Sequence, residues 1–379
     1  MNAETTVGAG MKVRCSRDEL VSKLSVVARA VSTRTAVQIL SGVMLRAEAG
    51  ELRLAATDME VSLRSSLEAE VEGEGAAVVP GKLLVDLARL LPDGEVVIEH
   101  RSEENVVRID CGPASYRLHA FSEEDFPRLP ELDAVGTFSV DREALLETIA
   151  RVSRSASRDE SRPVLTGILV RFEPGKLVMA ATDSYRLAAK ETPLAGEAPD
   201  LEAIIPARAL GELQRIATSG DAVELGVHEN QVVFGVGQDS GSIWLTSRRI
   251  DGQFPNIGQL VPETFEHELV VPRVELLEVV RRTSVMAQRN SPLRLRFAEG
   301  ELTVSAQTQD IGEARESLPV AYSAEPLEIG FNAEFLRDGL ESVDADEVRF
   351  RLISPLRPAV LQTAESDFTY LIMPIRLAG

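Results

Sequence analysis

Side chains that commonly carry out catalysis or bind metals are scattered along this chain. The four histidines are His100, His119, His228 and His267. None of them has the spacing to another histidine or to a cysteine that is typical of a zinc site. The sequence also contains no phosphate-binding loop of the Walker type and no nucleophile elbow. We therefore expect a protein that is not an enzyme and that needs neither a metal nor another cofactor.

Two short motifs could bind a ligand, but each has a simpler interpretation. Gly235-Val236-Gly237 follows a predicted strand, yet it lacks the third glycine and the following helix of a dinucleotide-binding loop. The acidic run 344–347 lies between a predicted helix and a predicted strand, which favours a polar turn over a cation site. Asp58 and Asp183 each follow a threonine at the end of a predicted strand. This position is typical of an aspartate that hydrogen-bonds its own backbone in a turn.

Positive charges gather at three places along the chain, each around a predicted helix. The first place holds Lys12, Arg14, Arg17, Lys23, Arg29 and Arg34. The second holds Arg151, Arg154, Arg158 and Arg162, and the third holds Arg273, Arg281, Arg282, Arg289, Arg294 and Arg296. The net charge of −20 argues against nucleic acid binding by the whole surface, but a minority face can carry the opposite sign. These residues are either ordinary solvated charges or parts of one positive surface.

The elements that would position these charges recur three times. The segment 50–58 (GELRLAATD) returns at 175–183 as GKLVMAATD and, less closely, at 300–308 as GELTVSAQT. The spacing of 125 residues is the same both times, and it is the size of a domain rather than of a solenoid repeat. The sequence therefore predicts three copies of one domain, although duplication for stability alone would leave the same pattern.

Each copy is predicted to fold as helix, strands, helix and strands, which is an α+β architecture. The apolar stripes of the first helices begin at Leu20, Leu145 and Leu276. Ser16 and Asp141 stand where helix N-caps would stand. The second helices follow Pro80, Pro206 and Asn332, and proline is favoured in a first helical turn. We place a leader at residues 1–10, expected to be disordered, and domains at 11–134, 135–262 and 263–379.

Composition agrees with a multidomain protein of the cytoplasm. The 379 residues are 44% hydrophobic but only 4% aromatic, so leucine, valine and isoleucine must fill the cores. No apolar run approaches the roughly 20 residues of a membrane-spanning helix, and no signal peptide is evident. Cys15 and Cys111 are expected to remain thiols, which is typical of a reducing compartment.

Over residues 11–379 the chain resembles a known family, the bacterial sliding clamp, which is the beta subunit of DNA polymerase III. The segments that carry the resemblance are Ile39-Leu40-Ser41-Gly42, Thr182-Asp183-Ser184-Tyr185-Arg186-Leu187, Phe254-Pro255 and 370–377 (YLIMPIRL). The resemblance implies three tandem DNA-clamp domains with helices lining an inner surface and antiparallel sheets outside. It also implies a head-to-tail homodimer that forms a six-domain ring.

The resemblance further implies a function as a DNA polymerase processivity factor. The ring would encircle double-stranded DNA without sequence preference, slide along it, and tether the replicative polymerase, the clamp loader and other clamp-motif proteins. By resemblance, or by position on a helix, the residues that face DNA are Arg34, Lys82, Arg208, Arg154, Arg158 and Arg289. Arg208 follows Pro206 just as Lys82 follows Pro80, so the internal repeat supports this pair independently.

A pocket for partner peptides is expected between the middle and last copies. The matching positions are Leu165, Thr182, Ser184, Tyr185, Arg186, Leu187, Pro255, Leu260, Arg357, Pro358, Met373, Pro374, Ile375 and Arg376. Leucine, methionine and proline would form an apolar groove, and Arg186 and Arg376 would serve the peptide's polar groups at its rim. Gln259 stands where many relatives carry a basic residue, and Tyr185 stands at an aromatic position that varies. Both differences could shift the preferred peptide motif.

The dimer contact is expected between the first copy of one chain and the last copy of the other. Tyr116 and Leu118 lie on the late strand that matches the family interface, and Val285 and Met286 lie on the facing helix. Two other functions stay open from the residues alone. One is a clamp-like scaffold that binds a protein or sequesters a drug without a role in replication. The other is an enzyme whose site spans two copies.

Overall fold

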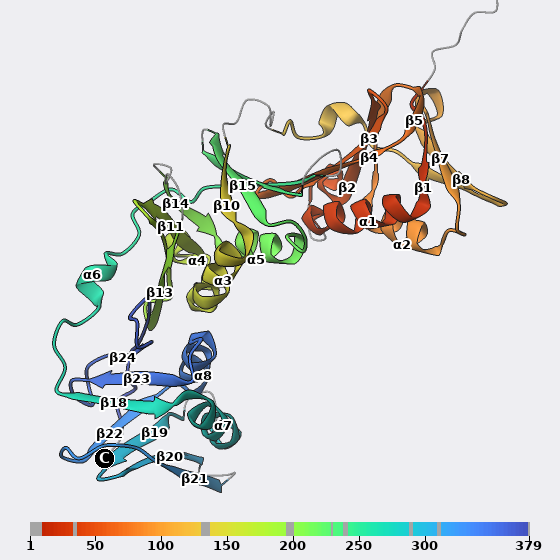
Figure 1. The fold of residues 1–379 in the computed structure, drawn as a ribbon. Helices are drawn as coiled ribbons and strands as arrows, with labels where there is room; N and C mark the ends of the chain where they lie inside the picture. The colour runs from red at the N-terminus through yellow and green to blue at the C-terminus, as the bar shows by residue number, and fades with distance from the viewer. Residues whose placement is uncertain are drawn as a thin grey trace, which may run out of the picture. The chain divides into compact units, whose positions relative to one another are not determined.

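A computed structural model of the chain (Figure 1) describes residues 10–32, 36–129, 137–194, 201–228, 230–237, 242–287, 291–308 and 312–377. Its contacts divide the chain into two compact units. Unit 1 contains Met1–Glu143 and Arg208–Arg249, and unit 2 contains Ala144–Ala207 and Ile250–Gly379. Each unit combines one outer copy of the repeat with part of the middle copy, so the compact units do not coincide with the predicted domains.

The main sheet of unit 1 has eight antiparallel strands in the order β10-β15-β16-β17-β4-β3-β2-β6. The strands from the first copy are β2 (Gly42–Glu48), β3 (Glu51–Thr57), β4 (Val61–Glu68) and β6 (Gly75–Pro80). Those from the middle copy are β10 (Thr137–Asp141), β15 (Ala222–His228), β16 (Gln231–Val236) and β17 (Ile243–Arg248). The sheet therefore runs across the boundary between two copies.

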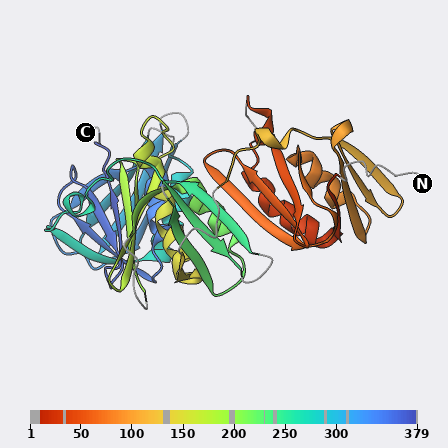
Figure 2. The ribbon, with the colours of Figure 1, turned by 90° about the horizontal axis from the view of Figure 1, so that it is seen from above.

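A second sheet of unit 1 belongs to the first copy alone and has the order β5-β1-β7-β8-β9. Its strands are β1 (Lys12–Ser16), β5 (Glu70–Gly73), β7 (Glu95–Arg101), β8 (Val106–Cys111) and β9 (Ala114–His119). The helices of this unit are α1 (Arg17–Val27), α2 (Gly81–Leu90) and α5 (Ala207–Ile216). Helices α1 and α2 pack on each other and on strands of the first copy (Figure 2).

The main sheet of unit 2 has eight antiparallel strands in the order β14-β11-β12-β13-β25-β24-β23-β18. The middle copy supplies β11 (Gly167–Glu173), β12 (Lys176–Thr182), β13 (Arg186–Pro193) and β14 (Glu202–Pro206). The last copy supplies β18 (His267–Pro272), β23 (Glu347–Leu352), β24 (Ala359–Gln362) and β25 (Phe368–Ile372). This sheet repeats the arrangement of unit 1 at the second boundary between copies.

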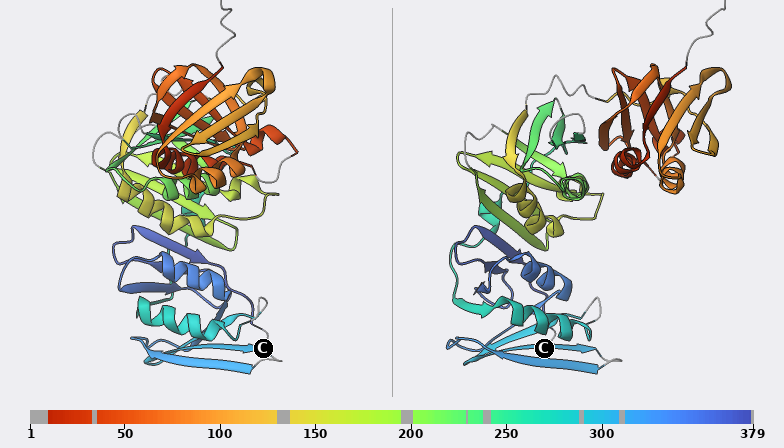
Figure 3. Two further views of the ribbon diagram at one scale, coloured as in Figure 1. Left: turned by 90° about the vertical axis from the view of Figure 1, so that its right-hand side faces the viewer. Right: turned by 45° about the vertical axis from the view of Figure 1, so that its right-hand side comes forward.

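The smaller sheet of unit 2 has the order β21-β20-β19-β22. Its strands are β19 (Leu293–Ala298), β20 (Glu301–Thr308), β21 (Gly312–Pro319) and β22 (Leu327–Phe331). The helices are α3 (Arg142–Val152), which begins in unit 1, α4 (Pro163–Thr166), α6 (Ile257–Leu260), α7 (Arg273–Ser284) and α8 (Ala333–Ser342). Helices α7 and α8 lie side by side against strands of the last copy (Figure 3).

Short 3₁₀ helices join these elements in both units. They are η1 (Ala28–Ala30), η2 (Gln38–Ser41), η3 (Ser102–Glu104), η4 (Glu123–Asp125) and η6 (Ser153–Ser155). Two of them, η1 and η6, extend the first helices of the first and middle copies. The repeat detected in the sequence therefore includes these short turns.

The two junctions between copies have the same register. In unit 1, Val61 of β4 faces Ser247 of β17. In unit 2, Arg186 of β13 faces Ile372 of β25. Each member of the second pair lies 125 residues after its counterpart in the first pair, which is the spacing of the sequence repeat. The repeat thus specifies how neighbouring copies pair as well as how each copy folds.

The apolar stripes predicted to begin at Leu20, Leu145 and Leu276 lie in α1, α3 and α7, but two details at helix starts differ. Helix α1 begins directly after Ser16, but the Ser16 side chain makes no capping hydrogen bond. Pro80 and Pro206 are the last residues of β6 and β14 rather than members of a first helical turn. Asn332 does cap α8, because its side chain accepts a hydrogen bond from the backbone N–H of Phe335.

Candidate functional site

The turn between β12 and β13 is built by the side chains of Thr182 and Asp183. The Thr182 hydroxyl donates to the carbonyl of Arg186 at 2.6 Å and accepts from the backbone N–H of Ser184 at 3.2 Å. The Asp183 carboxylate accepts from the backbone N–H groups of Tyr185 at 2.9 Å and Arg186 at 3.0 Å. Ser184 takes a left-handed φ of 81°. These bonds hold the Tyr185 side chain, which is 61% exposed, at the tip of the turn.

The same turn stands in the first copy between β3 and β4. The Thr57 hydroxyl donates to the carbonyl of Val61, and Asp58 accepts from the backbone N–H groups of Glu60 and Val61. Met59 takes the left-handed conformation, with φ at 78°. The turn chemistry predicted for Asp58 and Asp183 is therefore confirmed. The two turns share a scaffold and differ in the side chains at the tip.

Arg186 is buried and fully engaged within unit 2. Its guanidinium donates to Asp183 at 3.1 Å, to Asp338 at 2.6 Å and to the carbonyl of Arg154 at 2.6 Å. It also lies 4.3 Å from the centre of the Phe335 ring. Burial alone would lower the pKa of Arg186, but Tyr370 and the two carboxylates outweigh it and raise that pKa.

Arg186 was expected at the rim of the pocket, but the structure buries its side chain in unit 2, and a contact of Arg186 with a peptide stays a prediction. The partners of its guanidinium are the two carboxylates and the carbonyl of its own chain. The physical reason is burial: a guanidinium removed from water must be paired, and the α8 carboxylate of Asp338 supplies that pairing. Arg186 thus fixes the turn that presents Tyr185 to the start of α8.

The C-terminal segment lies across this turn. Strand β25 pairs with β13, and the backbone N–H of Met373 then donates to the carbonyl of Tyr185 at 2.8 Å. Two residues later the N–H of Ile375 donates to the carbonyl of Gly330 at 2.8 Å. Met373 stays 40% exposed, so it is not a core residue. Arg376 is exposed and makes no hydrogen bond or ion pair within the described parts of the chain.

An apolar cluster underlies one face of the sheet where β13 and β25 meet. Its buried members are Leu169, Ala180, Leu187, Val360 and Leu371. The partly buried side chains packed on it are Ala189, Phe254, Ile257, Val261 and Phe265. At the junction of the first and middle copies, Ser62 and Thr246 replace Leu187 and Leu371, as the shared register shows. The apolar face therefore continues across both strands of the second junction, whereas polar side chains interrupt it at these positions of the first.

The other residues expected in the pocket come from several segments of unit 2. Leu165 is partly buried in α4, Pro255 is partly buried after β17, and Leu260 is exposed at the end of α6. Arg357 is exposed and Pro358 is half-buried in the turn that precedes β24. Pro374 and Ile375 are half-buried beyond β25.

Sequence reasoning missed Val360, Leu371 and Phe335 as members of the site. Val360 and Leu371 stand on strands that are buried almost throughout, so no alternation of apolar and polar residues could have indicated which side chains belong to the site. Phe335 lies in the predicted second helix of the last copy, three residues after Asn332. Its ring stacks on Tyr185 with centroids 6.5 Å apart, and no short-range pattern links residues so distant in the sequence.

The residues expected to face DNA differ in their pairing. Arg208 lies 2.5 Å from Asp58 and 3.7 Å from Glu60, and Arg154 pairs with Glu341 and more distantly with Asp338. Lys82 and Arg158 are exposed, and neither has a hydrogen-bond or ion-pair partner among the described residues. Arg34 and Arg289 lie outside the described residues. The positive charges expected along the helices are thus offset in part by neighbouring carboxylates.

The four residues expected at a dimer contact occupy one sheet edge and the segment after a helix. Tyr116 and Leu118 lie on β9, the outermost strand of its sheet; Tyr116 is exposed, whereas Leu118 is buried within unit 1. Val285 and Met286 were expected on a helix, but α7 ends at Ser284, so they directly follow it. At the end of α7 the backbone N–H of Val285 donates to the carbonyl of Arg282, three residues earlier, as in a 3₁₀ turn. Val285 is 77% exposed.

The motifs with possible ligand chemistry have structural roles. Trp244 covers Gly235, where an added Cβ would lie 2.7 Å from the indole ring. The acidic run 344–347 forms the turn between α8 and β23, and Arg151 pairs with Asp344 at 2.5 Å. Within the described ranges, no group of three histidine, cysteine or acidic side chains could hold a metal ion. None of the described helices is long and apolar enough to span a membrane.

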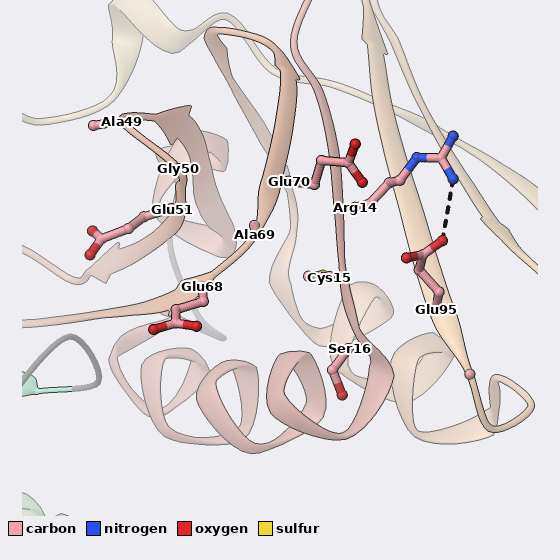
Figure 4. Close-up of a pocket in the computed structure, with 11 residues that line it drawn as sticks. Arg14, Cys15, Ser16, Ala49, Gly50, Glu51, Glu68, Ala69, Glu70 and Glu95 are labelled. Carbon is pink, nitrogen blue, oxygen red and sulfur yellow. Dashed lines mark hydrogen bonds and ion pairs between the residues drawn. The ribbon is translucent and has the colours of Figure 1, made fainter.

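A cavity of about 820 Å³ in the first copy is acidic (Figure 4). Glu51, Glu68, Glu70 and Glu95 line it, and Arg14 donates to Glu95 at 3.3 Å. Cys15 lies at its wall as a free thiol whose burial raises its pKa to about 12. Such a lining repels phosphate, so this cavity is not the place for a nucleic acid backbone.

Comparison with known proteins assigns the three copies one by one. Residues 11–130 match the N-terminal domain of the DNA polymerase III beta subunit, residues 139–256 match its central domain, and residues 258–376 match its C-terminal domain.

Whole proteins give the same result. A beta sliding clamp from Streptomyces coelicolor is 35% identical over 97% of this chain and 100% of its own length. A beta sliding clamp from Synechococcus elongatus is also 35% identical, again over 97% of this chain and 100% of the relative. The crystal structure of the DNA polymerase sliding clamp from Bacillus subtilis covers 98% of this chain and 100% of its own, with 26% identity and a TM-score of 0.92.

Proposed function

We infer the function from one premise: this chain belongs to the DNA polymerase III beta subunit family, the bacterial sliding clamps. It consists of three tandem clamp domains and acts as a processivity clamp for DNA polymerase. We propose that it catalyses no reaction and works in the cytoplasm, as a replication protein does. The domain boundaries after residues 134 and 262 are part of this proposal. The scaffold without a role in replication is not favoured, because the curated relatives named above are beta sliding clamps.

We propose that two copies of the chain close a ring through a third junction of the kind seen twice within the chain. Strands β4 and β13 each pair with the last strand of the next copy, β17 and β25 respectively. The corresponding strand of the last copy is β21, and that of the first copy is β9. Both are outermost strands of their sheets. Pairing β21 with β9 of a second copy would remove two open edges that otherwise invite aggregation.

The register of this third junction follows from the other two. Trp244 faces Arg64 where β17 pairs with β4. Tyr116 takes the place of Trp244, because each precedes a Phe-Pro pair by ten residues. Arg315 takes the place of Arg64, because Arg64 pairs with Ala55 and Arg315 pairs with Ser305, which lies 250 residues after Ala55. Tyr116 and Arg315 are both exposed in the single chain, so both side chains are accessible to a second chain. We therefore propose that Tyr116 of one chain faces Arg315 of the other, with Leu118 facing Glu313. The repeated register is the observation that carries the ring.

DNA inside such a ring would meet dispersed basic residues rather than one tight site. Lys82 has a free ammonium group for phosphate, whereas Arg208 and Arg154 would have to share their charge with Asp58 and Glu341. Arg158 lines a cavity that also contains four carboxylates, so its charge is less available to DNA. Phosphate contacts of this kind position a duplex without reading its sequence. The weak net attraction suits a protein that must slide.

Retention on DNA of different topology tests the ring. Loaded onto nicked circular plasmid, the protein should stay bound through gel filtration, and linearising the plasmid should release it. A matched plasmid kept circular by a blocked restriction site controls for dilution. Equal loss from circular and linear DNA would overturn encirclement.

The partner site proposed here is the apolar face at the junction of β13 and β25, with Met373 and Tyr185 at its border. Its apolar residues can receive the anchors of a short peptide, and Arg376 is free to pair with the peptide's polar groups. Met373→Arg should lower the affinity for a clamp-motif peptide at least about tenfold, because a charge would replace an exposed apolar contact. Val274→Arg, an exposed valine on α7, is the matched control. Unchanged binding by the Met373 variant would overturn the assignment.

A further inference from the structure

A second cavity, which lies in unit 2, has a volume of about 550 Å³ and adjoins the turn that carries Tyr185. It is formed by the chain from η6 to α4, by the β12–β13 turn and by the first turns of α8. Its size lies in the range of known ligand pockets, roughly 300–1,000 Å³. Tyr185 and Arg186 belong both to this cavity and to the residues expected to bind partner peptides, so the two sites are continuous.

One wall of the cavity is aromatic. Tyr185 stacks on Phe335 with an angle of 27° between the rings, and the Arg186 guanidinium also lies over the Phe335 ring. Arg186 in turn is held by Asp183 and Asp338. Within this wall Arg186 is buried, Phe335 is partly buried and the ring of Tyr185 is exposed.

Five arginines line the cavity, and they differ in how completely they are paired. Arg186 is saturated, Arg154 pairs with Glu341, and Arg162 donates to Asp159 and to the hydroxyl of Ser184. Arg337 has only a distant contact, 3.8 Å from Asp338. Arg158 has no partner among the residues that the structure describes. Arg158 and Arg337 thus bring unsatisfied positive charge to a cavity beside an exposed aromatic ring.

We propose that this cavity receives carboxylate side chains that flank the hydrophobic anchors of a bound partner peptide. The inference rests on the peptide site proposed above and names the chemistry of the peptides that the site prefers. Arg158 and Arg337 pair with one or two glutamates or aspartates, while the Tyr185 ring packs against the peptide between them and the apolar anchors. The clamp then selects partners whose binding segments carry acid next to the anchors.

A short acidic peptide fits this cavity better than a strand of nucleic acid. The lining also contains Asp159, Asp183, Glu334 and Asp338, so only two guanidiniums are available to a ligand. A continuous run of phosphates would meet these carboxylates and a chain whose net charge is −20. One or two carboxylates, by contrast, match the two available charges. Because the cavity is continuous with the peptide site, the apolar anchors of the same peptide would add their contacts to these charge pairs.

Two peptides that differ only in their flanks test the proposal on the full-length protein. Both peptides carry the same clamp motif, and one has Glu-Glu where the other has Gln-Gln beside the anchors. The comparison is made once with this flank before the anchors and once with it after them. Fluorescence anisotropy should show that the Glu peptide binds roughly two- to tenfold more tightly at low salt, which is the range for two exposed charge pairs. The preference should vanish at high salt.

The variant Arg158→Gln/Arg337→Gln should remove the preference and leave the Gln peptide unaffected. Arg46→Gln, an exposed arginine on β2, is the matched control and should change neither affinity. Equal binding of both peptides to the unmodified protein would overturn this inference while leaving the peptide site intact. Failure of both peptides to bind would instead contradict the peptide site itself. Displacement of the Glu peptide by a single-stranded oligonucleotide, lost in the double variant, would overturn the choice of ligand class.

Discussion

Arg186 shows how one buried charge can organise a site. Its guanidinium joins the β12–β13 turn to α8 through Asp183 and Asp338, and the Tyr370 hydroxyl donates nearby to the carbonyl of Phe335. Removing one partner of a buried pair leaves a charge uncompensated, which commonly costs 3–5 kcal/mol. Asp338→Asn should therefore lower the free energy of unfolding by about 3 kcal/mol, measured by chemical denaturation.

Asp86→Asn is the control for that substitution. Asp86 lies on α2 at the position in the first copy that corresponds to Asp338, but it is exposed and has no ion-pair partner in the described ranges. Its replacement should change the stability by less than about 0.5 kcal/mol. Equal effects of the two substitutions would show that the Arg186–Asp338 pair adds nothing to stability.

Asp367 and Glu341 predict a loss of stability in acid. Burial alone would raise the pKa of each carboxyl, but hydrogen bonds and positive charges outweigh it, so both pKa values lie below the ordinary value. The partners are Lys190 and Thr363 for Asp367, and Arg281 and Arg154 for Glu341. Because these folded-state pKa values lie below the unfolded ones, the stabilisation is present at neutral pH. It disappears as the pH falls through the folded-state values.

Thermal unfolding between pH 7 and pH 3 measures this effect. The melting temperature of Asp367→Asn should start lower at neutral pH and fall less steeply in acid than that of the unmodified protein. Glu103→Gln, at an exposed glutamate, should leave the slope unchanged. Parallel curves for all three proteins would contradict the assigned role of Asp367.

At the scale of the element, α8 depends on a glycine in its middle. Tyr370 of β25 is fully buried and its ring lies against Gly339, where an added Cβ would be 2.5 Å from the ring. Gly339→Ala should destabilise the protein by about 1–2 kcal/mol, because overpacking outweighs the gain in helix propensity. Gly211→Ala in α5 is the control, since nothing lies within 4 Å of its Cβ position. That substitution should stabilise by up to about 1 kcal/mol, and circular dichroism during melting can compare both.

The helices and strands could largely be predicted from sequence because each copy repeats the same stripes and turns. The turn at Asp58 and Asp183 was predictable, since its hydrogen bonds are local. The contact of Tyr185 with Phe335 was not, because it joins residues of different copies. For the same reason Arg186 was expected at a rim: its partner Asp338 lies far along the chain, and burial is a property of the assembled sheet rather than of the motif.

At the scale of the whole molecule, the third junction can be tested by exchanging charges. Tyr116→Arg should place two arginines opposite each other in the proposed register and weaken the dimer at least about tenfold. Adding Arg315→Glu to the same chain should restore it, because each junction then contains an arginine and a glutamate. Sedimentation equilibrium over a range of protein concentrations measures both outcomes.

The single variant Arg315→Glu and the control Val274→Glu complete that experiment. The control changes an exposed valine on α7 and should not affect association. Recovery of the dimer only in the double variant would support the register residue by residue. A Tyr116→Arg chain that dimerises as well as the unmodified protein would contradict it.

The pairing of β4 with β17 also has a consequence for synthesis of the protein. Strand β4 is complete early in translation, whereas its neighbour β17 is made only after most of the middle copy. At roughly 5–20 residues per second, the β4 edge stays open for on the order of ten seconds or more. An unpaired strand edge on a nascent chain is a target for chaperones and a nucleus for misassembly between neighbouring polypeptides. The first copy therefore keeps an open strand edge on the ribosome until β17 has been made.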